Sequence, residues 1–161
     1  MQRAAADASW TSHKLALSDH SGTETFHISP EAMASSLLPL GLQAELEPGH
    51  AYTESEIVQT ARLDDLRVAK QGEFAYLKID VQGHELEVLK GARETIQQHC
   101  AAVELELSFV PLYSGQALAH DLMAWMAERA FRLVSIEVSW RERRTGNLLL
   151  ANGLFTASGG D

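Results

Sequence analysis

The sequence predicts an α/β fold, because strand and helix patterns alternate through its second half. FAYLKID (74–80) is a compact apolar strand, and the stretch 84–98 places apolar residues at helical spacing, with Gly91 weakening that helix without ending it. AAVELELSF (101–109) and the helical pattern of 116–130 repeat the order. Strand, helix, strand, helix implies parallel strands joined by right-handed crossovers.

The chain is predicted to close with an antiparallel hairpin. FRLVSIEVSW (131–140) and NLLLANGLFTA (147–157) have strand patterns, and only the polar segment RERRTG (141–146) separates them. A link this short joins antiparallel neighbours. We therefore expect a mostly parallel sheet with a C-terminal antiparallel hairpin.

The first third of the chain holds shorter elements. HKLALSD (13–19) and TETFHIS (23–29) are predicted to be two strands joined by a turn at Ser-Gly. The stretch 29–56 is rich in Ser, Pro and Gly as far as Tyr52 and is predicted to be a loop or a lid. IVQTARL (57–63) is predicted to be a short strand.

Composition limits the function. The 161 residues are 45% hydrophobic, which suits one domain over 1–161. A formal charge of −9 opposes binding to nucleic acid or an anionic membrane and favours a neutral or cationic small substrate. Cys100 is the only cysteine, which excludes an intrachain disulfide and suits a reducing compartment. With no apolar run of membrane-spanning length, we expect a soluble, cytoplasmic protein.

Polar residues at the carboxyl ends of the strands are the first candidates for a site, since ligands bind there in open α/β sheets. Asp80 ends one strand and precedes Gly83, whose missing side chain permits close approach of a ligand. Glu85 lies in the first turn of the helix. A simpler alternative makes Asp80 the helix cap and Glu85 a partner of the helix dipole.

The strand 101–109 carries two carboxylates, Glu104 and Glu106, between apolar residues. Either this face is open to solvent, or Glu106 lines a polar cleft and acts with Asp80 as a general base for a hydroxyl. A hydrolase using the same pair would need a metal or an activated water, for which no motif occurs. The seven histidines show no ligand spacing, so no metal site is predicted.

LKIDVQGHELEVLKGARETI (77–96) resembles the signature of FkbM-type methyltransferases, usually K-I-D-v-E-G-x-E-x-x-v-L-x-G-a. Similar segments follow the family's order over 10–22, 35–37, 58–66, 106–116 and 145–155. The resemblance covers almost the whole chain. It implies a class I Rossmann-like domain that uses S-adenosylmethionine to O-methylate a hydroxyl of a sugar, polyketide or other small metabolite. Specificity would lie in the loops 29–52 and 111–116.

The resemblance also implies roles for individual residues. The implied cofactor-binding residues are Ser18, Asp19, Asp80, Gln82 and Gly83, the first two near the adenine. The implied catalytic residues are Asp80, Glu106 and Glu85, with Glu106 facing the acceptor. Gln82 stands where the family usually has Glu, and Asn152 where it often has Asp.

One part of the family pattern is not found. The family begins with a strand, a glycine-rich cofactor loop, a helix and a second strand, and no such loop precedes Asp19. The expected sheet order of three, two, one, four, five, seven, six would then lack strands one and two, which bares the edge of strand 74–80. Either 12–28 covers this edge, or the chain forms a homodimer through it. An alternative function follows: a catalytically inactive remnant that acts as an oligomerisation or interaction module.

Overall fold

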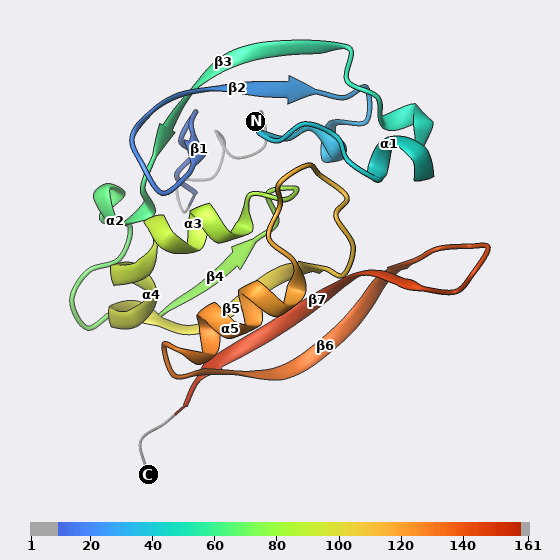
Figure 1. Cartoon of the computed structure of the whole chain (residues 1–161). Helices are drawn as coiled ribbons and strands as arrows, with labels where there is room; N and C mark the ends of the chain where they lie inside the picture. The colour runs from blue at the N-terminus through green and yellow to red at the C-terminus, as the bar shows by residue number, and fades with distance from the viewer. Residues whose placement is uncertain (1–9, 159–161) are drawn as a thin grey trace.

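The computed structural model describes residues 10–158, which form two β-sheets and five α-helices (Figure 1). The strands are β1 (Ala16–Leu17), β2 (Gly22–Ile28), β3 (Glu54–Ala61), β4 (Ala75–Ile79), β5 (Cys100–Ser108), β6 (Phe131–Arg141) and β7 (Leu148–Ala157). The helices are α1 (Gln43–Leu46), α2 (Leu63–Leu66), α3 (Glu85–Gly91), α4 (Arg93–His99) and α5 (Ala119–Ala127), with 3-10 turns η2 (Ala32–Ala34) and η3 (Pro48–His50). No helix among the described residues is long and apolar enough to cross a membrane.

The four-stranded sheet has the order β4-β5-β7-β6. This order agrees with the four, five, seven, six expected from the resemblance. The expectation of a mostly parallel sheet is wrong, however, because only β4 and β5 pair in parallel, whereas β7 pairs antiparallel with both β5 and β6. The short link after β6 makes the final hairpin antiparallel, as predicted, and β7 then inserts between β5 and β6. The fold is therefore a mixed α/β fold.

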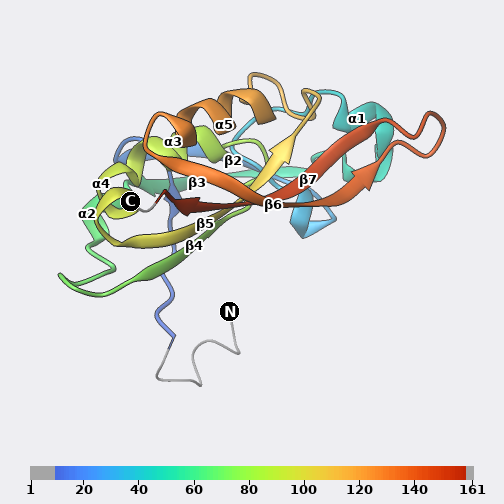
Figure 2. The ribbon, with the colours of Figure 1, turned by 90° about the horizontal axis from the view of Figure 1, so that it is seen from below.

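One face of this sheet packs into the core. Val103, Leu105 and Leu107 alternate along β5 and are fully buried, together with Leu89 of α3 and Leu122 of α5. Figure 2 shows α3 and α5 on the same side of the strands. The period of two in β5 and the helical period of α3 and α5 each present one apolar face, and these faces bury each other.

The outer edge of β4, unlike the core face of the sheet, is left open to solvent. β4 is the last strand of its sheet and pairs only with β5, and its Tyr76 side chain is 58% exposed. The expectation that 12–28 covers this edge is wrong, because β1 pairs with β3 in parallel and β2 pairs with β3 antiparallel, in a separate sheet. Homodimerisation through β4 stays a prediction.

The predicted helix over 84–98 is broken into α3 and α4 at Ala92. A Cβ at Gly91 would lie 2.0 Å from the carbonyl oxygen of Ser18, so the two backbones meet in a contact that only glycine permits. Asp64 then supports the start of α4, where its Oδ1 accepts a hydrogen bond from the Thr95 backbone N–H at 2.9 Å. The break is thus set by tertiary contacts.

The segment predicted as a loop or lid over 29–56 contains short helices and ends inside a strand. It holds η2, α1 and η3, and β3 already begins at Glu54, three residues before the predicted start at 57. Isolated bridges join His27 to Ser36 and Leu40 to Tyr113. The segment is therefore packed against the rest of the chain and forms one wall of the site described next.

Candidate functional site

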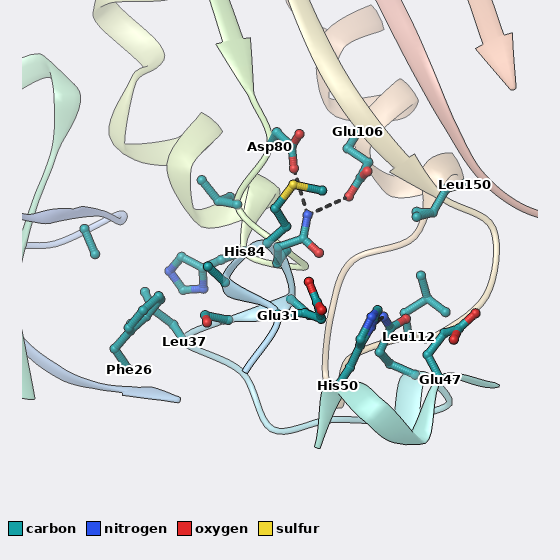
Figure 3. Close-up of a pocket in the computed structure, with 18 of the residues that line it drawn as sticks. Phe26, Glu31, Leu37, Glu47, His50, Asp80, His84, Glu106, Leu112 and Leu150 are labelled. Carbon is teal, nitrogen blue, oxygen red and sulfur yellow. Dashed lines mark hydrogen bonds between the residues drawn. The ribbon is translucent and has the colours of Figure 1, made fainter. Parts of the chain in front are cut away.

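A cavity of about 830 Å³ lies at the carboxyl ends of β4 and β5 (Figure 3). Its walls come from β1 and β2, the segment 29–56, the turn after β4, and the start of β7. Apolar side chains predominate, among them Leu15, Leu17, Phe26, Met33, Leu37, Leu112, Trp140 and Leu150. The charged residues of the lining are Glu31, Glu47, Asp80 and Glu106. An apolar cavity with a few polar groups is the usual form of a small-molecule site.

The turn after β4 holds the polar groups of the cavity in place. Gln82 and Gly83 have φ values of 55° and 96°, so two left-handed residues follow each other. A Cβ at Gly83 would lie 3.0 Å from Tyr113, which leaves little room for a side chain. The buried Glu85 carboxylate accepts hydrogen bonds from the backbone N–H groups of Val81 (3.1 Å) and Gly83 (3.2 Å). Glu85 therefore fixes the turn and does not line the cavity.

Gln82 joins the two candidate carboxylates. Its Nε2 donates to Asp80 Oδ1 at 2.8 Å and to Glu106 Oε2 at 3.2 Å, as the dashed lines in Figure 3 show. The Tyr113 hydroxyl donates to Gln82 Oε1 at 2.8 Å, and the Ser36 hydroxyl donates to the Gln82 backbone carbonyl at 2.6 Å. With Oε1 accepting from Tyr113, both amide protons face the carboxylates. The alternative in which Asp80 caps the helix is wrong, since its carboxylate binds Gln82 and no side chain caps α3.

The environment of Glu106 raises its pKa to about 7. Burial is the largest cause, followed by the negative charges of Asp80 and Glu85, and the hydrogen bond from Gln82 acts in the opposite direction. A carboxylate with a pKa near neutrality can accept a proton at neutral pH and still exist largely in its basic form slightly above it. The Glu106 carboxyl group can therefore exchange a proton near neutral pH.

Glu104 lies two residues earlier on the same face of β5 and has the opposite environment. The Tyr76 hydroxyl donates to its Oε2, and Lys78 Nζ lies 3.0 Å from its Oε1. These partners lower its pKa. The sequence left two alternatives for this face of β5, an open face or a polar cleft. The face is open to solvent at Glu104, whereas Glu106 lines the polar cleft.

Ser18 and Asp19, which the resemblance places near the adenine of the cofactor, lie in different parts of the structure. Ser18 is buried, and its hydroxyl is 3.1 Å from Nε2 of His84, which itself lines the cavity. Asp19 is exposed, lies 2.7 Å from His20 Nδ1, and lines a separate surface depression together with Lys90. The structure thus brings Asp80, Gln82 and Glu106 together, places Ser18 behind His84, and separates Asp19 from this cavity.

Sequence reasoning missed Tyr113 and His84. His84 belongs to the signature stretch itself, so its position was a usable signal, whereas nothing local marks Tyr113 as a partner of Gln82. The two segments proposed for specificity do meet: the Gly41 N–H donates to the Leu112 carbonyl at 2.8 Å, and Leu112 lines the cavity. Within 10–158, no three His, Cys, Asp or Glu side chains are arranged to hold a metal ion.

Comparison with known proteins identifies the family. A family model described as the methyltransferase FkbM domain matches residues 4–133, which is most of the 161-residue chain. No curated protein and no solved structure matches the chain. The matched stretch includes the turn after β4, the carboxylates Asp80 and Glu106, and the segment 29–56 that walls the cavity. The chain therefore belongs to the FkbM family of methyltransferases.

Proposed function

We propose that this chain is an S-adenosylmethionine-dependent O-methyltransferase that acts on a hydroxyl group of a small molecule. One observation carries the proposal: Asp80 and Glu106, at the ends of two parallel strands, are joined by Gln82 inside a cavity of a methyltransferase-family chain. Ligands of open α/β sheets bind at this end of the strands.

The lining of the cavity fits the cofactor. Its described residues include four carboxylates and no lysine or arginine, so the site favours a positively charged group such as a sulfonium. Asp80 and Gln82 would hold the cofactor, and the left-handed turn at Gly83 keeps them in place. S-adenosylmethionine held there would supply an electrophilic methyl group for transfer to the acceptor oxygen and would leave as S-adenosylhomocysteine.

The residues of the chain contribute proton acceptance and positioning. Glu106 accepts the proton that the acceptor hydroxyl loses, and its pKa of about 7 makes this possible at neutral pH. Gln82 keeps the Glu106 carboxylate fixed, because the Tyr113 hydroxyl holds the amide in one orientation. Apolar walls limit the water around these groups, which strengthens their electrostatic interactions. Orientation of reactants alone contributes a large share of the rate in such a reaction.

Isothermal titration calorimetry tests this proposal. The chain should bind S-adenosylmethionine with micromolar affinity and S-adenosylhomocysteine more weakly, because the second compound lacks the sulfonium charge. Asp80→Asn should weaken S-adenosylmethionine binding by about tenfold, the effect of one partly buried charge. Asp65→Asn is the matched control: it removes the same charge from a residue that does not line the cavity, and it should leave binding unchanged.

The contrary result is equally specific. A chain that is folded by circular dichroism and binds neither compound would contradict the proposal. That outcome would support the alternative of an inactive family member that serves as an interaction module, for which the exposed β4 edge would be the first surface to examine.

A further inference from the structure

The outer edge of β6 is the longest open strand edge among the described residues. β6 is the last strand of its sheet and pairs only with β7, and Figure 1 shows it along the outer margin of the molecule. Its 11 residues present backbone N–H and C=O groups that no described strand accepts. Soluble proteins usually shorten such an edge or place lysine or proline on it, and β6 has neither feature. The edge is therefore suited to pair with another strand.

The side chains of β6 form an apolar face and a charged face. Leu133, Ile136 and Val138 lie opposite the β7 residues that face the core, yet each is between 39% and 50% exposed. Arg132 and Glu137 lie opposite the outward-facing residues of β7. Both charges are exposed, and neither forms an ion pair with another described residue. An apolar stripe and two unpaired opposite charges are thus left on one open strand.

One antiparallel register makes this strand complementary to a second copy of itself. When Arg132 is placed opposite Glu137 of a second copy, two-fold symmetry also places Glu137 opposite Arg132 of that copy. Residues directly opposite each other in an antiparallel pair point to the same face and interact. The other pairs of this register are apolar, Leu133 with Ile136 and Phe131 with Val138. Charge and hydrophobicity therefore match in the same register.

The bulge of β6 is compatible with this register. The pairing of β6 with β7 shifts between Leu133 and Ser135, which leaves Val134 as the extra residue. The extra residue is the reason that Arg132 and Glu137, five positions apart, lie on one face. In a two-fold pair the same bulge lies between the two ion pairs on both strands, so it does not displace one strand along the other.

We infer that two copies of the chain associate through β6 in this antiparallel register, which joins their four-stranded sheets into one. The occupant of the open edge is thus a second copy of the chain. The interface does not depend on the proposed activity, because it would form equally in an active and in an inactive chain.

The β4 edge, at the other end of the same sheet, is less suited to this role. β4 has five residues, and its one charged residue, Lys78, already contacts Glu104 at 3.0 Å. Two paired β4 strands would therefore bring no oppositely charged residues of their own together. The length and the charges of the two edges both favour β6.

Charge exchange at Arg132 and Glu137 tests the inference, with sedimentation velocity of the full chain as the measurement. The wild type should sediment as a dimer at a chain concentration of about 50 µM, since a single strand edge gives an interface of modest size. Arg132→Glu or Glu137→Arg places like charges opposite each other twice, and each should raise the dissociation constant about tenfold or more. The two substitutions combined in one chain restore both ion pairs and should restore the dimer.

Arg143→Glu is the matched control for these variants. It makes the same charge change at an exposed residue between β6 and β7, outside the proposed pairs, and it should leave the dissociation constant unchanged. Circular dichroism of every variant checks that the chain is folded.

A cysteine cross-link locates the two-fold axis. Ser135 lies beside the axis in this register, so two Ser135→Cys residues fall within the distance that a disulfide spans. Mild oxidation should join the two chains of this variant. Thr145→Cys, at the exposed link between β6 and β7, lies far from the axis and should not be joined. The native Cys100 is buried and is present equally in both variants.

The outcomes decide the inference directly. A monomeric wild type would overturn it. A dimer that survives both single charge changes would also overturn it and would turn attention to another surface such as the β4 edge. A folded double variant that stays monomeric, or a Ser135→Cys chain that is joined no faster than Thr145→Cys, would contradict the register. Restoration of the dimer by the double variant would support it, whatever the result of S-adenosylmethionine binding.

Discussion

Glu104 and Glu106 differ by two positions on one face of β5, yet the structure gives them opposite chemistry. Glu104 lies among Tyr76 and Lys78 on the open part of the sheet, and its pKa is lowered. Glu106 lies at the carboxyl end of the strand, partly buried beside other acidic groups, and its pKa is raised to about 7. The strand pattern gives both residues the same orientation, so the difference comes entirely from what packs around each end.

The largest expected effect separates the two glutamates by activity. Glu106→Gln should lower kcat by about 10² to 10⁴-fold, because an amide cannot accept the proton of the acceptor hydroxyl. Transfer of a radiolabelled methyl group to a small hydroxyl acceptor would measure it. Glu104→Gln is the control on the same strand face and should change kcat less than about twofold. Equal losses in both variants would remove Glu106 from the role of base.

The next effect concerns stability against pH. The folded pKa of Glu106 lies above its ordinary value of 4.5, so its burial stabilises the protonated form. Between pH 4.5 and about 7 the folded state binds more protons than the unfolded state, and the free energy of unfolding should fall by about 3 kcal/mol as pH rises through this window. Urea unfolding of the wild type and Glu106→Gln at pH 5 and pH 8 would measure it. The variant should lose most of this dependence, and an unchanged slope would contradict the account.

A smaller effect tests Gln82, which stands where the family usually has Glu. Gln82→Glu removes two N–H donors and adds a negative charge beside Asp80 and Glu106. We expect a loss of about 1–3 kcal/mol in the free energy of unfolding at pH 8 and a higher pKa for Glu106. The pH dependence of methyl transfer should shift upward accordingly. If the variant were as stable as the wild type with an unshifted profile, Gln82 would not be the residue that holds the pair.

The smallest effect is expected on the open part of the sheet. Lys78→Met removes the partner of Glu104, but both groups are in contact with solvent. The free energy of unfolding should change by less than about 1 kcal/mol, and the change should shrink further in high salt. Thermal unfolding at low and high ionic strength would measure it. A loss as large as that of Gln82→Glu would show that the two ends of β5 do not differ as described.

The comparison also shows how far the sequence could predict the molecule. The strands at 74–80, 101–109, 131–140 and 147–157 were predicted well, because each carries its own apolar pattern and turn signals. The helix break at Ala92 was not predicted. It depends on the contact of Gly91 with the Ser18 carbonyl, and Ser18 is distant in sequence. The insertion of β7 between β5 and β6 is a long-range pairing that no local pattern encodes, and only the family resemblance predicted it.

The same distinction holds in the candidate site. Asp80, Gln82 and Glu106 could be predicted because each lies at the end of a recognisable strand or in the signature stretch. The position of Asp19 outside the cavity could not be predicted, since it depends on how β1 pairs with β3. The hydrogen bond from Tyr113 to Gln82 could not be predicted either, because it joins two loops that meet only in the folded chain.

The most direct test of the central claim is an NMR titration of the chain with ¹³C-labelled glutamate carboxyl groups, with Glu104→Gln and Glu106→Gln used to assign the two signals. We predict that Glu106 titrates at about pH 7 and that Glu104 titrates below its ordinary value of 4.5. We also predict that the pKa of Glu106 is higher in Gln82→Glu. A Glu106 signal that titrates together with Glu104 near the ordinary value would contradict the assignment of Glu106 as the base.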